Sequence, residues 1–225
     1  MMRKLIAAAI AAVFLTLWPT SAYARDELKN TDPEKYYIVL NLNNQYGTVY
    51  EKDQNGEYTK IVRRILCSSG KTGTGEIDPE TGQKDIGSPT PTGIWRIGGR
   101  ERFGKFADFS GTYARYWTQI VGDNYFHSIM FSKRNLDTMQ SNAFRNMGTK
   151  QSHGCVRLYV EDAKWLYYYA CPGTLINVTD QIKVTSETKA IRKALKISNF
   201  KEYNEFRKKY LIRLNCPKKG MGRCG

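Results

Sequence analysis

Residues that could do chemistry gather around Cys155, in the segment Ser152-His153-Gly154-Cys155-Val156-Arg157-Leu158. The chain holds only two histidines, His153 in this segment and His127 at the end of an apolar run. A thiol attacks a carbonyl as the thiolate, and a neighbouring imidazole produces the thiolate by taking the proton. A cysteine or a histidine alone is more often just buried. Two histidines in the whole chain, set around one cysteine, favour a cysteine nucleophile with a histidine base.

The residues that flank Cys155 suit acyl transfer. Gly154 lets a substrate approach the backbone closely and lets peptide N–H groups point at a developing oxyanion. Arg157, two residues further on, can hold a carboxylate through a bidentate contact. The pattern therefore predicts a carbonyl substrate that also presents a carboxylate.

The chain resembles the L,D-transpeptidase (YkuD-type) family, whose signature is an upstream His followed at a distance by Ser/Thr-His-Gly-Cys. The resemblance covers roughly Tyr36 to Asp180, and its specific part is the SHGCVRL block. It also includes the PTPTG turn, the YWTQI run that leads to His127-Ser128, the DAKWLY helix and the Gly-Thr that opens the last strand. Twenty-four residues separate His127 from Ser152, more than is usual in the family. We interpret the excess as an insertion in the loop over the site.

The resemblance implies a role for each matching position. Cys155 is the nucleophile, and His127 is the general base and later the general acid. Ser128 orients the imidazole through its backbone carbonyl, as the third member of a triad-like arrangement. Further residues are implied to shape the oxyanion region (His153, Gly154), to support the loop (Ser152) and to meet a substrate carboxylate (Arg157). Tyr116 and Trp117 line the cleft or pack behind it, and packing is the stronger interpretation.

The activity that the resemblance implies is peptidoglycan L,D-transpeptidation. Cys155 would attack the carbonyl of the third residue of a tetrapeptide stem, D-alanine would leave, and an amine of another stem would resolve the thioester into a 3-to-3 cross-link. Two alternatives stay open: an L,D-carboxypeptidase with water as acceptor, and a non-catalytic wall-binding protein. No metal or organic cofactor is expected, and the absence of a CxxC pair argues against zinc.

Short runs rich in β-branched and aromatic residues predict strands at 36–42, 47–53, 58–67, 93–97, within 116–131, and at 174–178. The loop from 68 to 92 is rich in Gly, Thr and Pro, and its prolines exclude a central strand. A helix is expected at 160–170, where Glu161 and Asp162 oppose the positive end of the helix dipole. We therefore expect a mostly β catalytic domain, a mixed sandwich or barrel of the L,D-transpeptidase type with one or two short helices.

A basic helical extension follows this domain. Ser186 is a candidate cap for a helix to about Ile197, and Asn199 with Glu202 resembles a capping box for a second helix. One face of the second helix would present Tyr203, Phe206, Tyr210 and Leu214, and one alternative is that this face docks onto the catalytic domain. Residues 181–225 carry thirteen Lys/Arg against three Glu, so they supply +10 of the formal +14. This charge suits anionic wall polymers bound through residues 186–225, or else a solvated surface, and nucleic acid is not expected as a partner.

The first residues predict export. Arg3 and Lys4 precede an apolar run that ends in the cleavage pattern Ala22-Tyr23-Ala24. The run is shorter than the ~20 residues of a membrane span, which makes an uncleaved anchor the weaker alternative. The expected organisation is a signal peptide (1–24), a linker (25–35), the catalytic domain (36–180) and the basic extension (181–225). The mature chain would work in the periplasm or cell wall, with no transmembrane segment after cleavage.

Five cysteines leave at least one thiol unpaired in an oxidising compartment. Cys155 is expected to stay reduced, while Cys67, Cys171, Cys216 and Cys224 can pair in three ways. Alternatively, Cys67 and Cys171 are buried single thiols of the core.

Overall fold

The computed structural model describes residues 27–77, 79, 81–107 and 111–208. The predicted signal peptide, Tyr210, Leu214, Cys216 and Cys224 lie outside the described residues. In the part of the chain that is described, no helix is both long and apolar enough to span a membrane.

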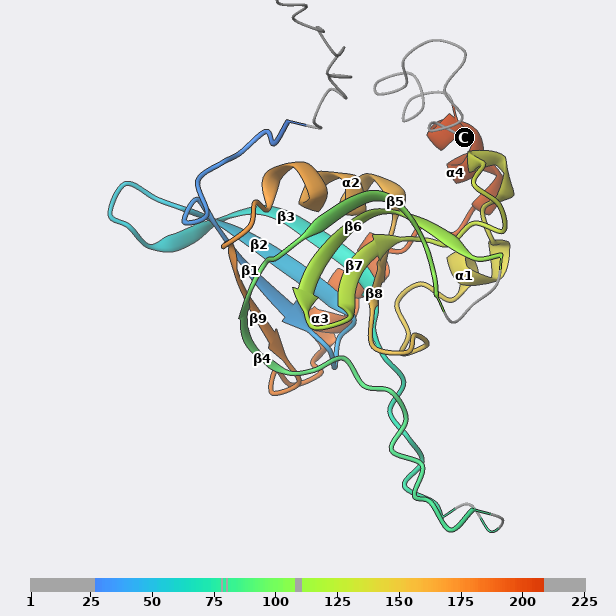
Figure 1. Ribbon diagram of the computed structural model, residues 1–225. Helices are drawn as coiled ribbons and strands as arrows, with labels where there is room; N and C mark the ends of the chain where they lie inside the picture. Colours follow the sequence, from blue (N-terminus) through green and yellow to red (C-terminus); the bar gives the residue numbers. More distant parts are fainter. Residues whose placement is uncertain (1–26, 78, 80, 108–110, 209–225) are drawn as a thin grey trace, which may run out of the picture.

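Nine strands form one sheet that curls around the core, so the expectation of a mostly β fold is confirmed (Figure 1). Their order across the sheet is β4-β9-β1-β2-β3-β8-β7-β6-β5. The strands are β1 (Tyr36–Asn41), β2 (Tyr46–Lys52), β3 (Tyr58–Ser68), β4 (Gly93–Arg96), β5 (Arg100–Lys105), β6 (Tyr113–Val121), β7 (Asn124–Ser128), β8 (Val156–Leu158) and β9 (Leu175–Thr179). Two neighbouring pairs are parallel, β1 with β9 and β7 with β8, and the other pairs are antiparallel.

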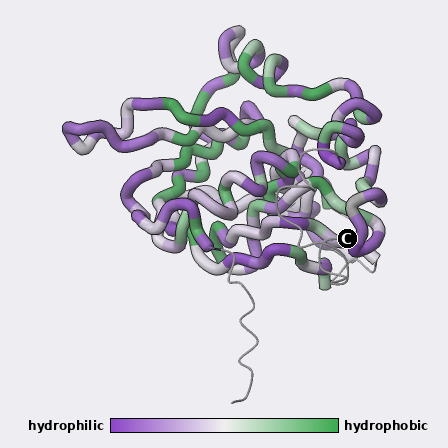
Figure 2. The backbone as a smooth tube through the Cα atoms, turned by 90° about the horizontal axis from the view of Figure 1, so that it is seen from above, coloured by the Kyte–Doolittle hydropathy of each residue, from purple (hydrophilic) through white to green (hydrophobic). Residues whose placement is uncertain are grey.

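Alternation along the strands builds the core. In β1, the inward positions Tyr36, Ile38 and Leu40 are buried, and the intervening positions are partly exposed. Figure 2 shows the same separation, with hydrophobic stretches within the body and a hydrophilic turn between β2 and β3 that projects to the left. The sheet therefore encloses its apolar face by curling.

The helices are η1 (Leu136–Thr138), α1 (Ser141–Arg145), α2 (Val160–Tyr169), α3 (Ser186–Leu195) and α4 (Phe200–Phe206). Helix α2 packs on β6 and β7, α3 lies against β3, and α1 lies beside α4 (Figure 1). The predicted cap of α3 is wrong by one residue, because the Thr185 side chain accepts from the N–H of Thr188 in a capping box. Asn199 caps α4 through the N–H of Glu202. Tyr203 of α4 is buried, whereas Phe206 is 49% exposed.

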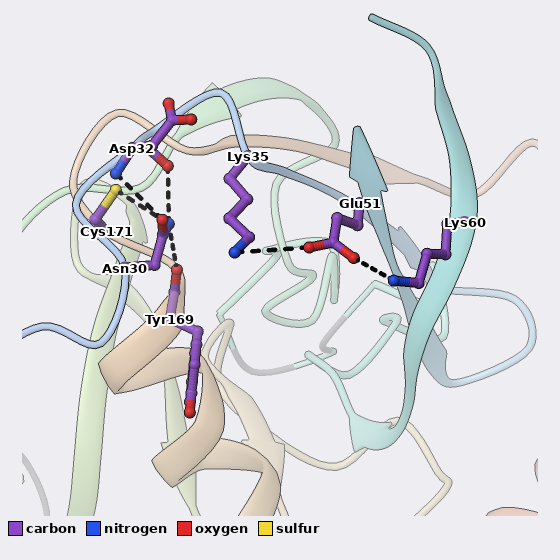
Figure 3. A network of polar contacts seen from close by, with 7 residues as sticks. All are labelled: Asn30, Asp32, Lys35, Glu51, Lys60, Tyr169 and Cys171. Atoms are coloured by element: carbon purple, nitrogen blue, oxygen red, sulfur yellow. Dashed lines mark hydrogen bonds and ion pairs between the residues drawn. The ribbon is translucent and has the colours of Figure 1, made fainter. Parts of the chain in front are cut away.

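Two of the cysteines that could have paired are free thiols. Cys67 lies in β3 with no exposed surface, and Cys171 is buried after α2. The Asn30 amide donates to the Cys171 sulfur over 3.8 Å and to the Tyr169 carbonyl over 3.0 Å. Figure 3 draws both contacts as dashed lines. The alternative of single buried thiols is therefore confirmed, and a disulfide through Cys67 or Cys171 is wrong for this structure.

A long arm leaves the body after β3 and returns to β4 (Figure 1). It spans residues 70–92, and its two sides are joined by isolated bridges between Thr72 and Gly87 and between Ile77 and Lys84. The arm lies within the loop in which prolines exclude a central strand, and its described residues contain no strand beyond these isolated bridges.

Candidate active site

Strands β7 and β8 bring His127 and Cys155 to one face of the sheet. The parallel register pairs His127 with Arg157 and Phe126 with Val156. Cys155 precedes β8 by one residue, and side chains two residues apart in an extended chain point to the same face. Cys155 and Arg157 therefore share a face with Tyr125 and His127.

The His127 imidazole is enclosed by aromatic rings and is only 1% exposed. The indole of Trp117 stacks on it with 4.9 Å between ring centroids, and the Phe106 ring meets it edge-on at 5.1 Å. Nδ1 lies 2.7 Å from the carbonyl oxygen of Ser128, so Nδ1 donates and Nε2 keeps its lone pair. Burial lowers the pKa of His127 to about 3, which keeps the imidazole neutral at pH 7.

The Cys155 thiol is half-buried and touches the backbone of the β6–β7 turn. Its Sγ accepts from the N–H of Tyr125 over 3.4 Å and lies 3.5 Å from the carbonyl of Asp123. Burial raises the pKa of Cys155, while the Tyr125 N–H and the Arg157 charge lower it. The resting pair is therefore a neutral thiol and a neutral imidazole.

Contacts from the base of the arm fix the loop before Cys155. The hydroxyl of Thr90, in the PTPTG turn, donates to the carbonyl of Gly154 over 2.6 Å and accepts from the N–H of Gly70 over 2.9 Å. Ser152 donates its hydroxyl to the Cys155 carbonyl and accepts from the N–H of Gly154 over 3.3 Å. The hydroxyl groups of Thr90 and Ser152 thus hold the loop before Cys155.

Gly154 is required by its backbone and by its neighbour. Its φ is +109°, which L side chains rarely adopt, and a Cβ there would lie 2.2 Å from Oδ1 of Asn124. The glycine therefore lets the nucleophile loop pass directly over the start of β7.

The other predicted site residues differ in exposure. Ser128 is buried, where its hydroxyl accepts from the N–H of Arg115 over 2.9 Å. Arg157 is half-buried, and within the described chain its Nε has no hydrogen-bond partner. His153 is exposed at the surface of the loop. Tyr116 packs on Tyr167 and Tyr168, as the packing interpretation predicted.

A cavity of about 340 Å³ adjoins the site on the β5–β6 side. Trp117 and Tyr125 form the wall that it shares with His127 and Cys155. Its remaining lining residues are Gly99, Arg100, Glu101 and Lys105.

Sequence reasoning missed three contributors to the site: Thr90, Asn124 and the N–H of Tyr125. The PTPTG turn was noted as a motif, and a buried threonine between two prolines could have been suspected of a polar role. For Asn124 and Tyr125 no sequence signal was available, because their contacts arise from the pairing of β7 with β8.

The comparisons with known proteins agree with one another. The family model for the L,D-transpeptidase catalytic domain (YkuD) matches residues 35–178. The Bacillus subtilis (strain 168) protein "Putative L,D-transpeptidase YciB" is 34% identical over 138 residues, which are 60% of this chain and 62% of that protein. The chain thus spans less than two thirds of the length of this relative.

Solved structures give weaker matches. An L,D-transpeptidase from Mycobacterium smegmatis is 19% identical with a TM-score of 0.45, over 64% of this chain and 58% of that one. One from Mycobacterium tuberculosis H37Rv is 24% identical with a TM-score of 0.44, over 64% and 57% of the two chains. Since the family model covers most of the chain, from the first strand to the last, the chain belongs to the family of YkuD-type L,D-transpeptidase catalytic domains.

Proposed function

We propose that the protein is an exported peptidoglycan L,D-transpeptidase in which Cys155 is the nucleophile and His127 is the general base. The observation that carries this proposal is the neutral imidazole held by the Ser128 carbonyl, on the same sheet face as the thiol. Export is supported by the leader pattern of the sequence.

The geometry suggests how the first step proceeds. Nε2 of His127 takes the thiol proton, and the Tyr125 N–H and the Arg157 guanidinium stabilise the thiolate. The sulfur then attacks the carbonyl of the third stem residue. His127, now protonated, gives the proton to the departing amine of D-alanine, and a thioester remains on Cys155.

Arg157 is the proposed contact for a substrate carboxylate. Its Nε is buried and lacks a partner in the described chain, so a carboxylate would satisfy it. An amine of a second stem then attacks the thioester and loses a proton to His127. The C–S bond breaks, the amide of the cross-link forms, and the released Cys155 thiolate recovers the proton from His127.

Intact mass spectrometry of the mature protein with purified muropeptide tests the proposal. Wild type should gain an acyl group on Cys155, and a thioester-forming carbapenem should label the same residue. Cys155→Ala should show neither adduct, since it lacks the thiol. A disulfide that includes Cys155, or acylation elsewhere, would contradict the assignment.

Product analysis separates the two acyl acceptors. An added D-amino acid should appear in the product of a transpeptidase, whereas a carboxypeptidase gives only the shortened stem. The same acyl-enzyme serves both reactions, so only the second step distinguishes them.

Anionic wall polymers are the proposed partner of the basic extension. Helix α3 has no buried residue, and its exposed cations include Lys189 and Lys193, with Lys196 at its end. Replacing these three lysines by glutamine should weaken co-sedimentation with purified walls at low salt and spare turnover of a soluble muropeptide. Retention equal to wild type across a salt series would reject the wall contact.

A further inference from the structure

Helix α4 of the extension packs onto the connection between the two proposed catalytic residues. The Tyr203 ring is 4% exposed and stacks on Phe144 of α1 at 5.2 Å. It also meets the Tyr159 ring at 5.4 Å, and Phe200 meets Phe144 edge-on at 5.2 Å. Phe144 lies between His127 and Cys155 in the chain, and Tyr159 lies just after β8. Helix α4 therefore contacts one aromatic residue that precedes Cys155 in the chain and one that follows it.

The Tyr203 hydroxyl completes the start of α2. The N-cap residue of this helix, Tyr159, offers no side-chain cap. Instead, the Tyr203 hydroxyl accepts from the N–H of Val160 over 2.9 Å and donates to Oε2 of Glu161 over 2.7 Å. Val160 is buried at the helix start, so its N–H depends on this hydroxyl as an acceptor.

The tyrosine cap lies next to the strand that carries the nucleophile. Strand β8 has only three residues, Val156–Leu158, and Tyr159 alone separates it from α2. Cys155 precedes this strand, and Arg157 lies at its centre. Because β8 is so short, its register against β7 depends on the loop before it and on the helix after it. A displacement of the start of α2 would therefore also displace Cys155.

We propose that Tyr203 is a positioning residue, whose hydroxyl fixes the β8–α2 junction and thereby holds Cys155 and Arg157 in register with His127. This inference rests on the proposed function only where its test measures acylation of Cys155. The basic extension is then part of the working catalytic unit as well as a charged surface.

The test compares Tyr203→Phe with Ile38→Val, a core change in β1 away from the site. Hydrogen exchange of a peptide covering residues 153–159 should speed up in Tyr203→Phe and match wild type in Ile38→Val. The rate constant of Cys155 acylation by muropeptide at saturation should fall about tenfold in Tyr203→Phe, with KM within twofold, because misplacement affects the reacting atoms more than binding.

A purely structural role for Tyr203 makes a different prediction. Both variants would melt at a lower temperature than wild type, but hydrogen exchange of residues 153–159 and acylation of Cys155 would equal those of wild type. This result would overturn the proposal. If Tyr203→Phe does not fold, Phe200→Ala provides the test, since it weakens the docking of α4 at a half-buried ring. In Phe200→Ala, exchange should be faster and acylation slower than in wild type, each by a smaller factor than expected for Tyr203→Phe. Values equal to those of wild type would refute the proposal. Exchange needs no substrate, so a wild type without acylation would count against the proposed function only.

Discussion

Replacing Thr90 by valine isolates one hydroxyl at the base of the arm. Valine keeps the shape of threonine, but it leaves the Gly70 N–H and the Gly154 carbonyl without their partner. Thr90 is 3% exposed, so water does not readily replace the hydroxyl. An unsatisfied buried group costs about 1–3 kcal/mol, so the two together should cost about 2–6 kcal/mol of unfolding free energy. The melting temperature should fall by roughly 4 °C or more.

The same variant should slow the chemistry, because the Gly154 carbonyl belongs to the residue before Cys155. Without the hydrogen bond from Thr90 to the Gly154 carbonyl, acylation of Cys155 should be at least about tenfold slower in an intact-mass time course with muropeptide. Thr90→Ser is the matched control, since serine keeps the hydroxyl and loses only a methyl group. If the valine and serine variants melt and react alike, the hydroxyl does not position the nucleophile loop, and the reasoning fails.

Four further predictions concern the site. His127→Ala should slow acylation of Cys155 about 10²-fold or more, and an unchanged time course would show that another residue is the general base. Because burial lowers the pKa of His127 from about 6.5 to about 3, the unfolded chain binds more protons between these values. Stability should therefore fall as pH drops through this window, by up to roughly 5 kcal/mol, and urea melts of His127→Gln should show a flatter dependence. Gly154→Ala should lower the melting temperature and acylation together, since its Cβ would lie 2.2 Å from Asn124 Oδ1, and a wild-type melt would refute the close approach. Iodoacetamide should label Cys155 in the native protein and spare Cys67, whose pKa burial raises; peptide mapping that finds Cys67 labelled at the same rate would show that β3 opens.

Strands with a clear apolar pattern were predictable from the sequence. The predicted bounds of β1 and β2 differ from those in the structure by one residue at one or both ends, because alternation and turn residues both mark these strands. Strand β5 was missed, since four of the six residues in RERFGK are charged. It lies at the edge of the sheet, where charged side chains reach water. Its Gly104 lies against the Trp117 indole, so the glycine reflects packing and does not mark a turn.

The roles of Cys155, His127 and the Ser128 carbonyl came from the family resemblance and stay predictions. The contacts that support these residues in the structure were not predictable from the sequence. The hydroxyl of Thr90 bonds to Gly154 across 64 positions of sequence, and such a contact depends on how the arm returns to the sheet. The docking of α4 was one of two alternatives that its apolar face left open. The charge of the extension is visible in composition, whereas the partners of Tyr203 are set by tertiary packing.

The strand order has a consequence for how the chain folds as it emerges. Strand β1 is made first, yet one of its two neighbours is β9, the last strand of the sheet. Strand β8 is inserted between β3 and β7, which are both synthesised before it. Strand pairings this distant in sequence form slowly, because closing the long loop costs chain entropy before any stabilising contact forms. A partial chain ending before residue 155 would lack β8, the partner strand of both β3 and β7, and would lack the Cys155 thiol beside the imidazole. The proposed nucleophile and base can therefore come together only after β8 has been synthesised and has paired between β3 and β7.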